Sequence, residues 1–203
     1  IPLAAILIAR PPRNRLSILL FLYAVLYIPL SVYANYLATH KVNGQFVNNI
    51  KIYFLISIIV FCCFALVLEN VIAIKNFRLI NRIIMVLAVL FSIANAIWLE
   101  GNNFFNSASA SVSSLICIIY CLIYYRRQLQ KPEGVFIEKL PSFWAVTGIF
   151  LYSAGNFFLF ACYRSLNAEK LDTLAVYMWY VNDVLILIMN IFFAKAIVCL
   201  RRK

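Results

Sequence analysis

An aspartate lies within an otherwise hydrophobic stretch near the carboxyl end of the chain, Asp183 in "YVNDVLILIMN" (180–190). A charged side chain at the centre of a membrane-spanning helix costs roughly 2.5–3.5 kcal/mol to insert, and such residues usually face the bundle interior or water. Helical spacing puts Asp183 on one face with three other residues, Trp179, Ile186 and Asn190. This face either lines a ligand site, or Asp183 is protonated and forms hydrogen bonds with Asn or Ser side chains of neighbouring helices.

Other polar residues are expected at a similar depth in the membrane. With a helical rise of 1.5 Å per residue, Asp183 lies about 15 Å from the outer surface, and Asn95, Asn156 and Ser114 lie about 6–12 Å from it. We therefore predict a ligand cavity in the outer half of the membrane. The predicted ligand-binding residues are Asp183, Asn156, Asn95, Ser114, Asn190 and Trp179.

A second acidic residue suggests an alternative use of the same region. Glu69 lies near the depth of Asn190, towards the cytoplasmic end of its hydrophobic stretch, so Asp183 and Glu69 could act as relays of a proton path. Snorkelling of the Glu69 side chain to water explains its position equally well.

The residue types that serve catalysis or bind metals are sparse. The single histidine, His40, falls in a connection, and the six cysteines form no CxxC pair, so no zinc pattern is present. Asp183 and Glu69 differ by about 10 Å in depth, too far to share one proton. Lys195 lies near the cytoplasmic edge, which argues against a retinal Schiff base. We predict no catalytic residue, metal or cofactor, and we lean against an enzyme.

The composition requires a membrane around the chain. Of 203 residues, 65% are hydrophobic and 12% are charged, with a mean hydropathy of +0.92. A soluble domain has about 25% charged residues, and a fold of this size cannot bury so much apolar surface. The net charge of +11 would suggest nucleic-acid binding in a soluble protein, but here the basic residues lie in short connections between apolar stretches. We therefore expect membrane lipids and no nucleic acid as partners.

The apolar stretches predict an all-α bundle of seven transmembrane helices in one domain, residues 1–203. Each stretch except the first approaches the 20 residues that a membrane-spanning helix needs. The opening "IPLAAILIAR" is too short, and we interpret it as the end of a helix that begins earlier; the alternative is a short segment at the membrane interface. The predicted helices are about 1–9 (partial), 16–37, 52–74, 83–99, 107–125, 143–163 and 173–197.

The basic residues predict the orientation of this bundle. Alternate connections place 14 of the 18 Lys and Arg residues on one side and 4 on the other. Because positive charge is retained on the cytoplasmic side, the richer side should face the cytoplasm. The amino end is then outside and the carboxyl end inside.

Two segments resemble a known family: "NNFFNSASASVSSLICIIYCLIYYRRQL" (102–129) and "LPSFWAVTGIFLYSAGNFFLFACYRSL" (140–166). They are similar to uncharacterised small seven-helix integral membrane proteins of Bacteroidetes-type bacteria. The resemblance implies the seven-helix fold and the bacterial inner membrane, and it implies no activity. The matching residues are Phe105, Asn106, Ser107, Pro141, Phe143, Trp144, Gly148, Tyr152, Gly155, Asn156 and Phe157.

The predicted function is a membrane module that binds a small molecule or a lipid in a cavity open to the outer half. It would signal to a separate cytoplasmic or membrane partner, and the connection 126–142 is the expected contact. One alternative is a proton-coupled transporter or permeation pathway that uses Asp183 and Glu69. Another is a structural or assembly protein that binds no ligand.

Overall fold

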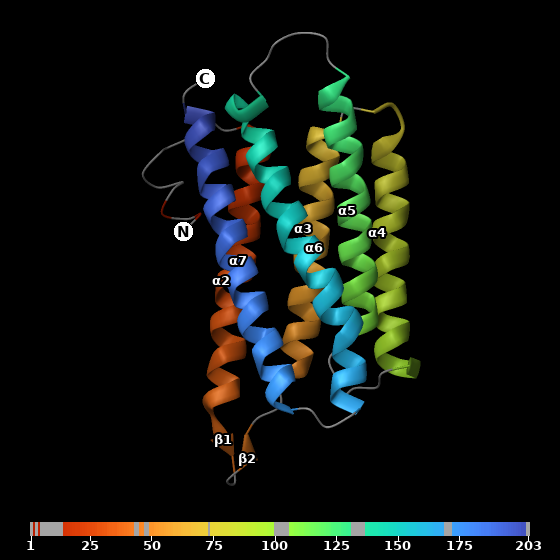
Figure 1. The fold of residues 1–203 in the computed structure, drawn as a ribbon, viewed down its shortest axis with the longest axis vertical. Helices are drawn as coiled ribbons and strands as arrows, with labels where there is room; N and C mark the ends of the chain where they lie inside the picture. The colour runs from red at the N-terminus through yellow and green to blue at the C-terminus, as the bar shows by residue number, and fades with distance from the viewer. Residues whose placement is uncertain are drawn as a thin grey trace.

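The computed structural model describes residues 2, 4, 14–42, 45–46, 49–72, 74–99, 106–130, 137–168 and 172–201. Within these residues, six long helices stand side by side in one bundle (Figure 1). The predicted partial helix over about 1–9 falls almost entirely outside the described residues, so a seventh helix stays a prediction. The six helices are α2 (Arg15–Thr39), α3 (Ile50–Val71), α4 (Phe77–Ala94), α5 (Ser107–Leu129), α6 (Pro141–Ala168) and α7 (Asp172–Arg201).

All six helices are long and apolar enough to cross a membrane. This confirms the predicted all-α bundle, and the chain has the architecture of a multi-pass membrane protein. Leu79, Val86 and Val184 are among many large apolar residues exposed on the outer faces of the bundle. Such faces are unfavourable in water and suit a lipid surround.

The ends of the helices differ from the prediction where charges or prolines occur. The predicted helix 83–99 begins at Phe77, because the exposed Arg78 and Arg82 extend from its first turns without interrupting it. Helix α6 begins at Pro141, a residue that fits the first helical position because its missing N–H would have no partner there. Hydrophobicity alone therefore underestimates helices whose ends lie among polar groups.

Short irregular elements join the long helices. A two-residue antiparallel hairpin, β1 (Lys41–Val42) and β2 (Gln45–Phe46), follows α2. A π-helical segment, η1 (Asn95–Leu99), continues α4, and a 3₁₀ turn, η2 (Ile137–Lys139), precedes α6. We call the end of the bundle with the hairpin the hairpin end, and the opposite end, where α7 finishes, the basic end (Figure 1).

Aromatic rings fill the centre of the bundle. Tyr23 of α2 contacts Phe193 of α7 edge to face at 5.4 Å between ring centroids, and Phe64 of α3 at 5.7 Å. Such pairs stabilise packing beyond the burial of area alone. They hold α2, α3 and α7 together on the basic-end side of the cavity described next, and Phe64 is also part of its wall.

Candidate functional site

A partly open cavity lies between five helices in the half of the bundle nearer the hairpin end. It encloses about 690 Å³ of space, a volume that includes the open solvent in its mouth. The sequence also places its predicted cavity in this half. The lining residues are Tyr27, Ser31, Tyr53, Ile56, Ser57, Val60, Phe61, Phe64, Ala110, Ser113, Ser114, Cys117, Tyr152, Ser153, Phe160, Trp179, Asn182 and Ile186.

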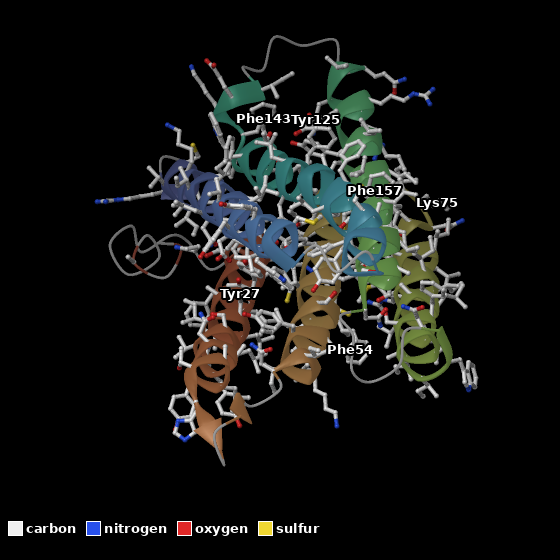
Figure 2. The ribbon with its side chains drawn as sticks, turned by 60° about the horizontal axis from the view of Figure 1, so that its bottom comes forward. Tyr27, Phe54, Lys75, Tyr125, Phe143 and Phe157 are labelled. Atoms are coloured by element: carbon white, nitrogen blue, oxygen red, sulfur yellow. The ribbon has the colours of Figure 1, made fainter. Side chains whose placement is uncertain are left out.

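The wall combines aromatic rings with hydroxyl groups. Tyr27 comes from α2 (Figure 2), while Ser113 and Ser114 come from the small-residue stretch that opens α5. Among the described residues of the wall, none carries a formal charge. A wall of this kind suits a ligand with an apolar body and a few polar groups.

Asn182 is the polar residue of the wall with an unmet hydrogen-bonding need. Its side chain is 7% exposed, and its Oδ1 has no hydrogen-bond partner within the part of the chain that the structure describes. A buried acceptor left unpaired costs about 1–3 kcal/mol. A ligand or water that donates a hydrogen bond inside the cavity would remove this cost.

Two of the predicted ligand-binding residues, Ser114 and Trp179, line the cavity. Asp183 does not, because α7 is rotated so that Asn182 faces inward and the next residue is exposed. Asp183 nevertheless lies close enough to the hydroxyls of Tyr27 and Tyr53 to interact with them electrostatically. It is therefore placed beside the cavity wall, towards α2 and α3.

The sequence analysis missed Asn182, although a signal for it exists. Trp179, Asn182, Ile186, Met189 and Phe193 follow the i, i+3, i+7 spacing of a buried helix face, and Met189 and Phe193 are fully buried. The predicted face shares Trp179 and Ile186 with the observed one and differs in having Asp183 and Asn190 where Asn182 and Met189 face inward.

Asn156 and Asn190 lie near the cavity but are not part of its wall. The Asn156 side chain is 1% exposed, and neither of its amide atoms has a hydrogen-bond partner among the described residues. It follows Tyr152, a wall residue, by one helical turn and lies close to its hydroxyl. Asn190 is half-buried, two turns beyond Asn182 on α7, in the direction of the basic end.

Asn95 is held in a polar contact between α4 and α5. Its Nδ2 donates a hydrogen bond to Oδ1 of Asn106, and Asn106 Nδ2 donates to the backbone oxygen of Ser92 at 2.7 Å. All three residues are buried. The contact joins the π-helical end of α4 to the start of α5, so Asn95 positions helices and does not line the cavity.

Glu69 is paired at the basic end and does not snorkel to water. Its side chain is buried, Oε1 accepts a hydrogen bond from Arg15 Nη2 at 3.3 Å, and Oε2 accepts one from Asn81 Nδ2 at 3.1 Å. Asn81 also donates to the backbone oxygen of Ala65 at 3.2 Å. This cluster joins α2, α3 and α4, and the structure does not bring Glu69 and Asp183 together.

Within the described residues, no group of three or more His, Cys, Asp or Glu side chains is placed to hold a metal ion. Comparison of the chain with protein-family models, curated proteins and solved structures found no match. The resemblance to the bacterial seven-helix family therefore stays a prediction, and the function rests on the geometry of the site.

Proposed function

We propose that the protein is a membrane module that binds a small molecule or a lipid in the cavity of the hairpin end. The unpaired Oδ1 of Asn182 in the cavity wall carries this proposal, because a buried acceptor without a partner marks a place where a ligand donor fits. The aromatic rings and serine hydroxyls around it supply the apolar and polar contacts that an amphipathic ligand needs.

The proposed orientation puts this cavity in the outer half of the bacterial inner membrane. The basic end carries many exposed Lys and Arg side chains, and Lys75 extends away from the bundle there (Figure 2). By the positive-inside rule this end faces the cytoplasm. The exposed basic residues of the described helices and turns at this end are Arg15, Lys75, Arg78, Arg82, Arg126, Arg127, Lys139, Lys195 and Arg201.

Signalling to a separate partner is the further part of the proposal. Helix α7 runs from the cavity to the basic end, so a change of packing around Trp179 and Asn182 would be transmitted along this helix to the basic end. Helix α5 ends at the basic end, where Arg126 and Arg127 are exposed. These basic residues would contact either the partner or anionic lipid headgroups.

The test is mass spectrometry of small molecules that co-purify with the protein, with Ser114→Phe compared with wild type. A phenyl group at Ser114 would occupy part of the cavity, so a defined molecule retained by wild type should bind less or be lost. Val112→Phe is the matched control, because Val112 lies on the same helix and is 40% exposed on its outer side. It should retain the molecule.

If all three proteins carry only the same bulk lipid, the binding proposal is wrong and a structural or assembly function is favoured.

A proton-coupled transporter is the other candidate, because the titratable Asp183 adjoins the tyrosines of the wall. It shares the cavity and differs in requiring pH-dependent solute uptake by proteoliposomes.

A further inference from the structure

Three aromatic residues from three helices meet at the part of the cavity nearest the hairpin end. The Trp179 ring lies 5.1 Å from the Tyr53 ring and 6.2 Å from the Phe160 ring, measured between centroids. Trp179 belongs to α7, Tyr53 to α3 and Phe160 to α6, and all three line the cavity. We call Tyr53, Phe160 and Trp179 the aromatic cage.

The rings of the cage are inclined to one another. The planes of Tyr53 and Trp179 meet at 42°, and those of Phe160 and Trp179 at 61°. Rings inclined in this way can present their electron-rich faces to a single guest, which stacked parallel rings cannot do. Aromatic faces grouped from several directions are the known means of binding ammonium groups.

The charges around the cage also favour a cation. Asp183 lies one helical turn after Trp179 and close to the hydroxyls of Tyr27 and Tyr53. Among the described residues, Asp183 forms no ion pair, and none of the wall residues is basic. A cation would supply the carboxylate with a counter-charge, whereas an anion would meet both the carboxylate and the negative ring faces.

The hydrogen-bonding groups point to the same class of ligand. Asn182 Oδ1 lacks a hydrogen-bond donor. Asn182 lies in the same wall as Trp179, which precedes it by three residues on α7. An ammonium group with N–H, or a hydroxyl attached to a quaternary ammonium, provides such a donor. An ionised carboxylate has only acceptors and would leave Asn182 Oδ1 unpaired.

From these contacts we infer that the ligand of the cavity carries an ammonium group, which binds in the aromatic cage with Asp183 beside it. The inference rests on the proposed ligand-binding function and specifies the ligand's chemistry. The ammonium comes either from a free amine or from the headgroup of a lipid.

The experiment measures binding of three probes to the full chain in lipid nanodiscs. The probes are benzyltrimethylammonium, its uncharged isostere neopentylbenzene, and phenylacetate. Benzyltrimethylammonium has no hydrogen-bond donor, so it tests the aromatic cage and Asp183 and not the contact with Asn182. Trp98→Phe and Trp144→Phe leave Trp179 as the single tryptophan, and quenching of its fluorescence reports occupancy of the cage. The ammonium probe should bind saturably and at least tenfold more tightly than the isostere, and phenylacetate should not bind.

Variants separate the charge from the aromatic faces. Asp183→Asn should weaken binding of the ammonium probe about tenfold and leave the isostere unchanged. Tyr53→Leu should have the same selective effect, and it keeps the inference testable if the first variant folds poorly. Glu138→Gln removes one carboxylate from an exposed turn near the basic end and should change nothing.

The lipid of the nanodisc distinguishes the two sources of the ammonium group. Phosphatidylcholine should compete with the probe if a lipid headgroup is the ligand, whereas digalactosyldiacylglycerol, which has no ammonium, should not. Equal affinity in both lipids would identify a free amine.

Equal binding of the ammonium probe and neopentylbenzene would overturn the ammonium inference and leave the ligand-binding function standing. The same conclusion follows if Asp183→Asn and Tyr53→Leu bind the ammonium probe as wild type does. Absence of saturable binding of the ammonium probe in digalactosyldiacylglycerol nanodiscs would overturn the ammonium inference, whereas the proposed function is tested separately by the co-purification experiment.

Discussion

Glu69 illustrates how a buried carboxylate in this bundle depends on its neighbours. It is 3% exposed and is satisfied by Arg15 on one oxygen and Asn81 on the other. Removing one partner of a buried pair leaves a charge without compensation, which usually costs more than the pair itself contributes. Arg15 is about half exposed, so water would compensate part of that loss.

We expect Arg15→Met to lower the free energy of unfolding by about 1–3 kcal/mol, because Glu69 loses its counter-charge. Glu69→Gln keeps an oxygen that accepts from Asn81 and should cost less. In the double variant, Arg15→Met should add little to Glu69→Gln, since the charge is already gone. Thermal unfolding in detergent measures all three, and additive losses would show that the pair is not coupled.

Helices α6 and α7 approach each other closely at a glycine, Gly148. A Cβ built on Gly148 would lie 2.9 Å from Phe192 Cβ and 3.2 Å from the backbone oxygen of Met189. Small residues permit such close approach of membrane helices, whose packing is not driven by expulsion of water. A Cβ on Gly155 would instead meet only the end of the flexible Leu185 side chain. Gly148 therefore permits the close approach of the α7 backbone, whereas Gly155 leaves room for a side chain.

Gly148→Ala should lower the free energy of unfolding by about 1–3 kcal/mol, because α6 and α7 must separate to admit the methyl group. Gly155→Ala is the matched control and should cost less than about 1 kcal/mol, since Leu185 can rotate away. Denaturation in mixed micelles, followed by circular dichroism, compares them. Equal losses would show that the backbone approach at Gly148 is unimportant.

The bundle as a whole has opposite chemical character at its two ends. Exposed basic residues such as Arg78, Arg126 and Arg201 gather at one end, and the cavity opens in the half nearer the other. Membrane insertion retains positive charge in the cytoplasm, so the whole molecule should insert in one direction. A ligand would then reach the cavity from outside or from the outer leaflet.

Single-cysteine labelling tests this orientation. In a background with the native cysteines replaced, His40→Cys at the hairpin end should react with an impermeant maleimide in intact cells. Gln130→Cys, exposed at the basic end, should react only after lysis. The reverse pattern would place the cavity in the cytoplasmic half and contradict the proposed access route.

The hydrophobic stretches alone were sufficient to predict the helices. Placing a charge in lipid costs free energy wherever it occurs, so each membrane-spanning stretch must be apolar by itself and can be recognised without the others. Six of the predicted helices are present, with shifts at ends such as Phe77, where arginines continue the helix. The depth of polar groups was also predictable, and Ser114 and Trp179 do line the cavity.

Which of these polar groups point into the bundle could be read only from the folded structure. Successive residues of a helix are about 100° apart around its axis, and packing against the other helices sets the rotation that decides which of them face inward. That rotation puts Asn182 in the wall and Asp183 beside it, and it lets Asn106 hold Asn95 and Arg15 hold Glu69. These partners lie on other helices, so no pattern within one hydrophobic stretch could indicate them.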